Sequence, residues 1–184
     1  NIQFSMQEGD YFCVNPKLNV GTSDLRYTSF TYPFVMNGTV RTLLGKYNRC
    51  NKLNQTTAYI NTMRYAGAYY IVAEAYCRKG ETEAARVLIN HYWHCIGVSE
   101  APAGITNQAL LELILTDKQR EFVGEGVNFF DLKRTHLASL PRYSQWGTSA
   151  SSSISSTDYR WNFPIPVSEY RFNSVEQNAG WPSN

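Results

Sequence analysis

The sequence predicts a mainly α-helical fold with a short β-hairpin and long irregular loops. Two stretches, residues 63–97 and 106–137, carry apolar residues at helical spacing and predict the helices. The flanking residues 1–62 and 138–184 lack that period and are rich in turn residues, so we expect extended chain there. A length of 184 residues suits one domain with its own core, and we interpret residues 1–184 as a single domain.

The composition excludes several classes of protein. A hydrophobic content of 43% excludes a disordered chain, and a net charge of only +2 argues against a nucleic-acid binder. No run of about 18 apolar residues is present, so no membrane-spanning helix is expected. Residues 1–10 have neither the basic start nor the apolar stretch of a signal peptide. The 13 Tyr and the low charged content of 17% favour a secreted or surface-exposed protein that handles polar ligands.

Residues 1–62 contain the predicted hairpin. Thr28–Phe34 and Thr39–Leu44 are β-branched and aromatic enough to be strands. Asn37-Gly38 lies between them and suits a two-residue hairpin turn.

Residues 63–97 predict two antiparallel helices joined by a tight turn. Gly80 breaks the helical period, and acidic residues in 81–83 restart it where a helix dipole favours them. The small Ala73 and Ala85 allow close approach of the two helices, and Tyr76 fills the gap between them. The apolar residues that repeat at helical spacing are Tyr65, Tyr69, Val72, Ala73, Tyr76, Ala85, Leu88, Ile89 and Tyr92. The spacing is that of a tetratricopeptide-like unit, which cannot bury both of its faces alone.

Residues 106–137 predict further helices, and residues 138–184 predict a loop and an extended tail. Thr106 is a suitable N-cap, and Leu111, Ile114, Leu115 and Phe122 form an apolar face. Gly124 and Gly126 interrupt this helix, and Val127–His136 resumes as a short one. The Ser-rich stretch Thr148–Thr157 predicts a mobile loop, and the tail from Trp161 to Asn184 has no regular period.

Charged residues concentrate in residues 120–134 and allow two interpretations. Glu121 and Glu125 are four residues apart, and Asp131 and Arg134 are three apart. Paired carboxylates occur in glycosidases, but that chemistry needs two carboxyl groups that face each other across a cleft. We favour a structural ion-pair lattice that includes Arg120 and pins the bend at the two glycines.

No cofactor, metal or catalytic nucleophile is expected. His91, His94 and Cys95 would make a conceivable metal site, but no further ligand stands at a usual spacing. Four Cys, at 13, 50, 77 and 95, match no zinc pattern and leave three disulfide pairings open. Their simplest interpretation is as small buried hydrophobic residues. No GxSxG or P-loop motif is present.

Aromatic side chains around the Ser-rich stretch are the candidate ligand contacts. Trp146 is the expected stacking residue for a sugar ring, with Tyr143 and Tyr159 beside it and Arg142 or Arg160 bonding hydroxyls. The alternative is that these rings, with Trp161, only pack the tail onto the helices.

Three motifs resemble the C-terminal half of the SusD/RagB family over about residues 20–184. The helix that begins at Met63 and ends at Gly80 is similar to the family's last tetratricopeptide-like unit. Arg120-Glu121, Glu125-Gly126 and Phe129–Arg134 resemble its charged signature. Asn162–Pro166, Glu169 and Gln177–Trp181 resemble its ending. Ser23–Arg26 and Leu44–Tyr47 resemble strands that precede the helix pair. Asn128 and Gln119 depart from the family pattern, in which basic residues are frequent at both positions.

The resemblance implies a non-enzymatic, helical protein that binds oligosaccharides at the outer membrane of Bacteroidetes. It also implies a SusC-like TonB-dependent transporter as partner, to which the glycan is delivered, and an N-terminal lipid anchor that this chain does not contain. The chain would then be a C-terminal portion. Two alternatives remain: a helical-repeat scaffold that binds a peptide or protein without sugar, and a carbohydrate-active enzyme.

Overall fold

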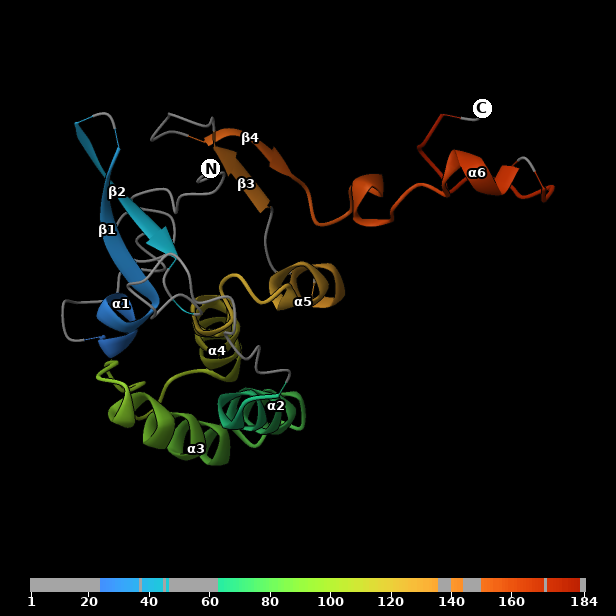
Figure 1. Ribbon diagram of the computed structural model, residues 1–184. Helices are drawn as coiled ribbons and strands as arrows, with labels where there is room; N and C mark the ends of the chain where they lie inside the picture. Colours follow the sequence, from blue (N-terminus) through green and yellow to red (C-terminus); the bar gives the residue numbers. More distant parts are fainter. Residues whose placement is uncertain are drawn as a thin grey trace. The chain divides into compact units, whose positions relative to one another are not determined.

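A computed structural model describes residues 24–36, 38–44, 46, 63–135, 140–143, 150–170 and 172–182 (Figure 1). The elements in chain order are α1 (Leu25–Phe30), β1 (Thr31–Met36), β2 (Thr39–Leu44), α2 (Tyr65–Arg78), α3 (Thr82–Cys95), α4 (Asn107–Glu121), α5 (Val127–Thr135), β3 (Leu140–Tyr143), β4 (Ala150–Ile154), the 3-10 turn η1 (Tyr159–Trp161) and α6 (Val167–Tyr170). The described residues are mainly α-helical, which confirms the predicted fold class. They belong to two compact units, residues 1–128 and 129–184, which are described separately below.

The predicted hairpin is present in the first unit. Strands β1 and β2 pair antiparallel from Thr31 with Leu44 to Met36 with Thr39. Gly38, in the turn, has a φ of 76°, which glycine adopts without strain. Asn37, its predicted turn partner, lies outside the described residues.

The segment before the hairpin differs from the prediction. Leu25–Phe30 is helix α1, so the first strand begins at Thr31 and not at Thr28, and Leu25-Arg26 is not strand. Tertiary contacts explain the difference, because the Leu25 amide donates to the Ile96 carbonyl at 2.9 Å and the Arg26 side chain is drawn into the core. Strand propensity of an isolated segment does not include such contacts.

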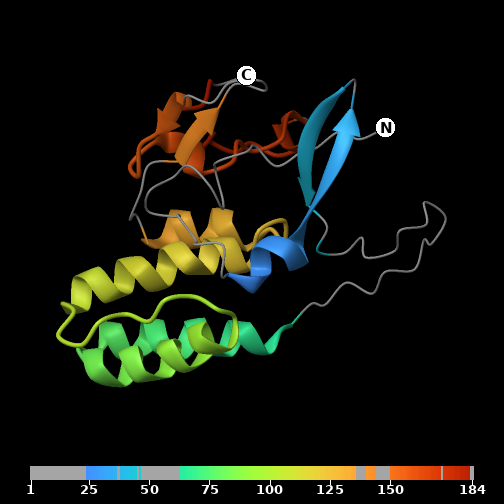
Figure 2. The ribbon, with the colours of Figure 1, turned by 90° about the vertical axis from the view of Figure 1, so that its left-hand side faces the viewer.

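Helices α2 and α3 form the predicted antiparallel pair (Figure 2). Both end in the same way. Gly80 and Gly97 have φ of 78° and 74°, and the residue after each donates its amide to a carbonyl five residues back. This Schellman arrangement satisfies helix-end carbonyls and stops each helix sharply.

The buried face of α2 is displaced by one residue from the predicted stripe. Ala66, Tyr70, Ala73 and Cys77 are its buried apolar residues, whereas Tyr65 and Val72 are exposed and Tyr69 and Tyr76 are half-buried. On α3 the predicted Ala85 and Ile89 are buried, together with Trp93. A tyrosine keeps its hydroxyl at the surface easily, so a stripe of tyrosines is a weaker marker of the core than small aliphatic residues are.

Helix α4 completes the core of the first unit. The Thr106 hydroxyl accepts from the Ala109 amide, as expected for the N-cap. The predicted Ile114, Leu115 and Phe122 are buried, with Leu110 rather than Leu111 beside them.

Of the four cysteines, Cys77 is buried and free, whereas Cys95 is free and exposed, against expectation. Cys13 and Cys50 lie outside the described residues. No helix of the described chain is long and apolar enough to cross a bilayer.

The second unit contains most of α5, the hairpin β3–β4, η1 and α6. Strand β4 covers Ala150–Ile154, so much of the Ser-rich stretch is paired strand and not the predicted loop. The core of this unit is small and consists of Leu132, Ile154 and Trp161, with Phe129 packed against them.

Candidate functional site

A buried guanidinium organises the charged residues of the first unit. Arg26, only 3% exposed, bonds Asp117 Oδ1 through Nη2 at 2.6 Å and Asp24 Oδ1 through Nε at 2.9 Å. Its Nη1 lies 3.3 Å from Glu121 Oε2. Asp117 also accepts from the Tyr70 hydroxyl at 2.5 Å and from Trp93 Nε1 at 2.7 Å. One carboxylate therefore ties α1, α2, α3 and α4 together.

The charges of this network are mutually stabilised. Burial alone would lower the pKa of Arg26, but the Asp117 and Asp24 carboxylates raise it well above its ordinary value. Burial alone would raise the pKa of Asp117, but Arg26 and Tyr70 hold it below its ordinary value. Both groups are therefore charged at neutral pH, and each depends on the other.

The two candidate glycosidase carboxylates are engaged in this network. Arg64 Nη1 lies 2.5 Å from Glu121 Oε1, and Arg64 Nη2 lies 2.9 Å from Glu125 Oε1. Lys46 forms a further ion pair with Glu125. Arg120 contacts Asp117 at 3.1 Å. The structural interpretation of Arg120, Glu121 and Glu125 is thus confirmed, at a bend where Gly124 and Gly126 have φ of 76° and 77°.

The predicted lattice is nevertheless not continuous. Asp131 and Arg134 form a separate pair inside α5, at 2.7 Å, in the second unit. The two departures from the family pattern are also connected: Asn128 Nδ2 donates to the Gln119 carbonyl at 3.1 Å.

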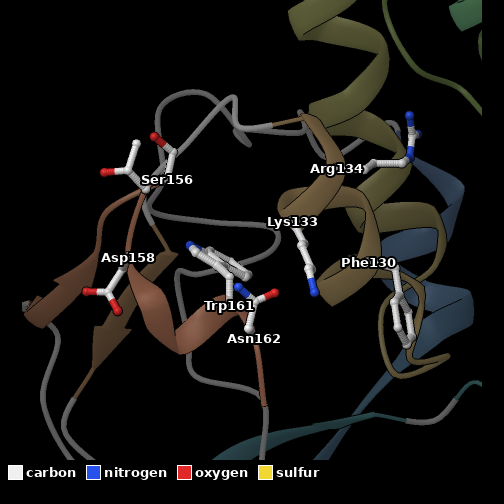
Figure 3. Close-up of a pocket in the computed structure, with 8 residues that line it drawn as sticks. Phe130, Lys133, Arg134, Ser156, Asp158, Trp161 and Asn162 are labelled. Carbon is white, nitrogen blue, oxygen red and sulfur yellow. The ribbon is translucent and has the colours of Figure 1, made fainter. Parts of the chain in front are cut away.

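The second unit contains a cavity of about 540 Å³, which is large enough for a small ligand (Figure 3). Its wall comes from one side of α5 and from the segment between β4 and Asn162. The lining residues are Phe130, Lys133, Arg134, Ser156, Thr157, Asp158, Trp161 and Asn162.

Two aromatic rings, those of Phe130 and Trp161, line this cavity, and Phe129 packs against both. Phe129 stacks on Phe163 with ring centroids 5.0 Å apart, and it contacts Trp161 at 5.4 Å and Phe130 at 5.6 Å. The Trp161 ring is fixed because its Nε1 donates to the Ser155 carbonyl at 2.7 Å. Phe130, by contrast, is 65% exposed. The cavity therefore has one rigid ring and one accessible ring.

Charged groups at the cavity are mostly paired. Arg160 bonds both oxygens of Asp158 at 2.8 Å, which lowers the pKa of Asp158 to about 2. Arg134 is bonded to Asp131. Asp158 is therefore ionised at neutral pH and is not poised as a general acid.

The predicted ligand residues are placed only in part. Tyr159 is exposed, begins η1 and packs edge-on against Trp181 at 5.2 Å. Tyr143 is the last residue of β3, Arg142 lies in the same strand, and Trp146 lies outside the described residues. Arg160 is held by Asp158. The role of Tyr143, Trp146 and Tyr159 as one site therefore stays a prediction.

Sequence reasoning missed Phe130 and Lys133. A signal was available, because Phe129 and Phe130 are neighbours in a nine-residue helix and cannot both face one core. A metal site is not supported either: within residues 63–135 and the other described ranges, no three His, Cys, Asp or Glu side chains gather around a common point. His91 and His94 are both exposed.

Comparison with known proteins shows the family of this chain. The model of the SusD family matches residues 2–181, nearly the whole chain. The chain belongs to the SusD family. No curated protein matches it.

Solved structures of SusD-like proteins share the fold. A SusD superfamily protein from Bacteroides vulgatus is 25% identical, with a TM-score of 0.66 over 88% of this chain and 36% of that one. A SusD-like protein from Bacteroides fragilis is 23% identical, with a TM-score of 0.56 over 77% and 30%. A SusD-like carbohydrate binding protein from B. vulgatus is 18% identical, with a TM-score of 0.60 over 83% and 38%. This chain spans about a third of each relative.

Proposed function

We propose that this protein is a non-catalytic glycan-binding protein and that the cavity of its second unit contacts the sugar. The observation that carries the proposal is the joint lining of that cavity by aromatic rings and by polar side chains. Membership of the SusD family supports it, as does the fold shared with a relative described as carbohydrate binding.

The lining suits a pyranose ring. Sugars present apolar C–H faces that pack on aromatic rings, and the accessible face of Phe130 offers such a surface. The Asn162 amide and the Thr157 hydroxyl can donate and accept hydrogen bonds with sugar hydroxyls. Tyr143, Trp146 and Tyr159 remain proposed additional contacts on the segments that border this site in sequence.

The proposed physiological role is delivery of the bound oligosaccharide to a SusC-like TonB-dependent transporter. We place the whole protein at the surface of the outer membrane, anchored by an N-terminal lipid. Family membership is the support for both statements.

The use of the carboxylates supports a role without catalysis. Glu121 and Glu125 are held by Arg26, Arg64 and Lys46, and Asp158 is held by Arg160. A glycosidase needs one of its carboxyl groups to transfer a proton at the scissile bond. Carboxylates that stabilise the fold or pair with arginine are poor candidates for that step.

A second function is favoured by one observation. Helix α2 exposes large apolar side chains, Tyr65, Ile71 and Val72, outside its buried face. Such a face suits a helical-repeat scaffold that binds a peptide or protein. Affinity for a protein partner without affinity for any sugar would favour this alternative.

Titration calorimetry with a panel of neutral and acidic oligosaccharides tests the proposal. We expect binding without release of new reducing ends, and a roughly tenfold weaker affinity for Phe130→Ala, or about 1.4 kcal/mol. Phe172→Ala is the matched control, because Phe172 is an exposed phenylalanine of the same unit away from the cavity. Equal affinities of the two variants would remove the cavity from the glycan site, and turnover would exclude a purely binding role.

A further inference from the structure

Lys133 is a cation at the cavity for which the described residues provide no counter-ion. Arg134, the other basic residue of the lining, is bonded to Asp131, and Asp158, its acidic residue, is bonded to Arg160. The Lys133 ammonium has no ion pair or hydrogen bond within the described chain. The two pairs cancel their own charges, so the lining has an excess of one positive charge at Lys133.

The position of Lys133 makes this charge available to a ligand. Its side chain is half-buried and extends from the last turn of α5 toward the side of Trp161 and Asn162 (Figure 3). An ammonium group that is partly withdrawn from water gains from an anionic partner, and it offers three hydrogen-bond donors. Asp158 is not free to be that partner, because both of its oxygens accept from Arg160.

Polar neutral groups and a ring surround this charge. Thr157 and Asn162 line the same cavity, and the exposed ring of Phe130 lies one helical turn before Arg134 on α5. The combination of a single cation, uncharged hydrogen-bonding groups and an aromatic face differs from a phosphate site, which usually gathers several cations or backbone amides. It fits a ligand that is mostly neutral and carries one negative group per unit.

We propose that this cavity takes an acidic sugar whose anionic group pairs with the Lys133 ammonium. The ring of that sugar packs on Phe130, and its hydroxyls bond Thr157 and Asn162. The anionic group is the carboxylate of a uronic acid or a sulfate ester, which share a single negative charge and several acceptor oxygens. This inference rests on the proposed function and adds the class of sugar.

Calorimetric titrations with matched pairs of sugars test it. The first pair is a galacturonate trisaccharide and its methyl ester, and the second is a sulfated galactan tetrasaccharide, which contains no uronic acid, and its desulfated form. We expect an acidic member to bind about tenfold more tightly than its neutral partner, as one charge-assisted hydrogen bond would give. Salt should weaken the preference, since the pair is partly solvated. The pair that shows the preference identifies the anionic group.

Variants of Lys133 separate charge from shape. Lys133→Met keeps the aliphatic chain and should reduce the preference to less than about twofold, whereas Lys133→Arg should keep most of it. Lys79→Met is the control, because Lys79 is an exposed lysine of the first unit. Melting temperatures of the variants should match that of the parent protein, which shows that the fold is intact.

Three other results of these titrations would contradict the inference. Binding of neutral sugars alone, or a preference for acidic sugars that survives in Lys133→Met, would overturn the acidic-sugar site and leave glycan binding intact. Failure to bind any member of the panels, neutral or acidic, would overturn both the inference and the proposed function.

Discussion

The two units of this chain use charged side chains in opposite ways. In the first unit Arg26, Asp117 and Glu121 are buried and satisfy one another across helices that are far apart in sequence. In the second unit the ion pairs between described residues are short-range, with partners two or three residues apart and partly exposed. The first unit has a large apolar core, and the described core of the second contains three buried residues.

One continuous stretch supplies both arrangements. Arg120, Glu121 and Glu125 belong to the buried network. Phe130 contributes an exposed aromatic ring to the cavity, and Lys133 contributes a cation that no described residue pairs. A charge-rich motif therefore need not have a single role. We expect substitutions in its first half to change stability and substitutions in its second half to change binding.

The largest expected effect follows from removal of the central guanidinium. Arg26→Met leaves the buried Asp117 without its main partner and removes one of the two arginines that hold Glu121. Loss of one member of a buried pair costs about 3–5 kcal/mol. Urea denaturation should show that loss in the free energy of unfolding. Lys79→Met, which breaks the exposed pair with Glu81, should cost less than about 1 kcal/mol. Equal losses in the two variants would contradict the distinction between buried and surface charge.

A smaller loss of stability is expected for Glu125→Ala. Lys46 and Arg64 lose one carboxylate, but Arg64 keeps Glu121, so we expect about 1–3 kcal/mol. Glycan affinity, measured by calorimetry on the same protein, should not change. An unchanged melting temperature together with lost binding would mean that Glu125 belongs to the ligand site.

Substitution of Trp146 tests binding and not stability. If it stacks on a sugar, Trp146→Ala should weaken the affinity roughly tenfold, about 1.4 kcal/mol, with little loss of stability. Tyr159→Ala should have a smaller effect, because its ring already packs on Trp181. Unchanged affinity of the Trp146 variant would remove residues 144–149 from the site and leave the cavity alone.

The smallest expected effect is a dependence of stability on pH. The folded-state pKa of Asp158 is about 2, below its ordinary value of 3.8. The ionised Asp158 therefore makes its full contribution to the free energy of unfolding above about pH 4. That contribution is lost as the pH falls through 2, and Asp117, whose pKa is also lowered, acts in the same direction. Urea denaturation between about pH 6 and pH 2 should show decreasing stability, with a shallower decrease in Asp158→Asn. A stability that rises on acidification would contradict both assignments.

Local patterns predicted much of the first unit. Thr106 predicted the start of α4, and Gly80 predicted the turn of the helix pair. The β-branched and apolar residues of Thr39–Leu44 predicted β2 with its bounds. The partner of Asp117 was not predictable, because Arg26 is 91 residues away and only the fold brings the two together. The displaced face of α2 has a different cause: its tyrosines repeat at helical spacing at the edge of the core.

The candidate site was predictable to a lesser degree. The cavity joins Phe130 and Lys133 on α5 to Asp158 and Trp161, and no local period connects these segments. Sequence reasoning did find the neighbourhood, since Tyr159 and Trp161 were both noted beside the Ser-rich stretch. It missed the part of the cavity lining that comes from α5, because the sequence of residues 129–134 indicates a structural ion-pair lattice.

A crystal structure of the protein with a bound oligosaccharide tests the central claim most directly. We expect a sugar ring in van der Waals contact with Phe130, and a sugar hydroxyl or anionic group within about 3.2 Å of Lys133, Thr157 or Asn162. The network around Arg26 should be unchanged by the ligand. A sugar bound only elsewhere, with the cavity of the second unit empty, would contradict the proposal that this cavity binds the glycan.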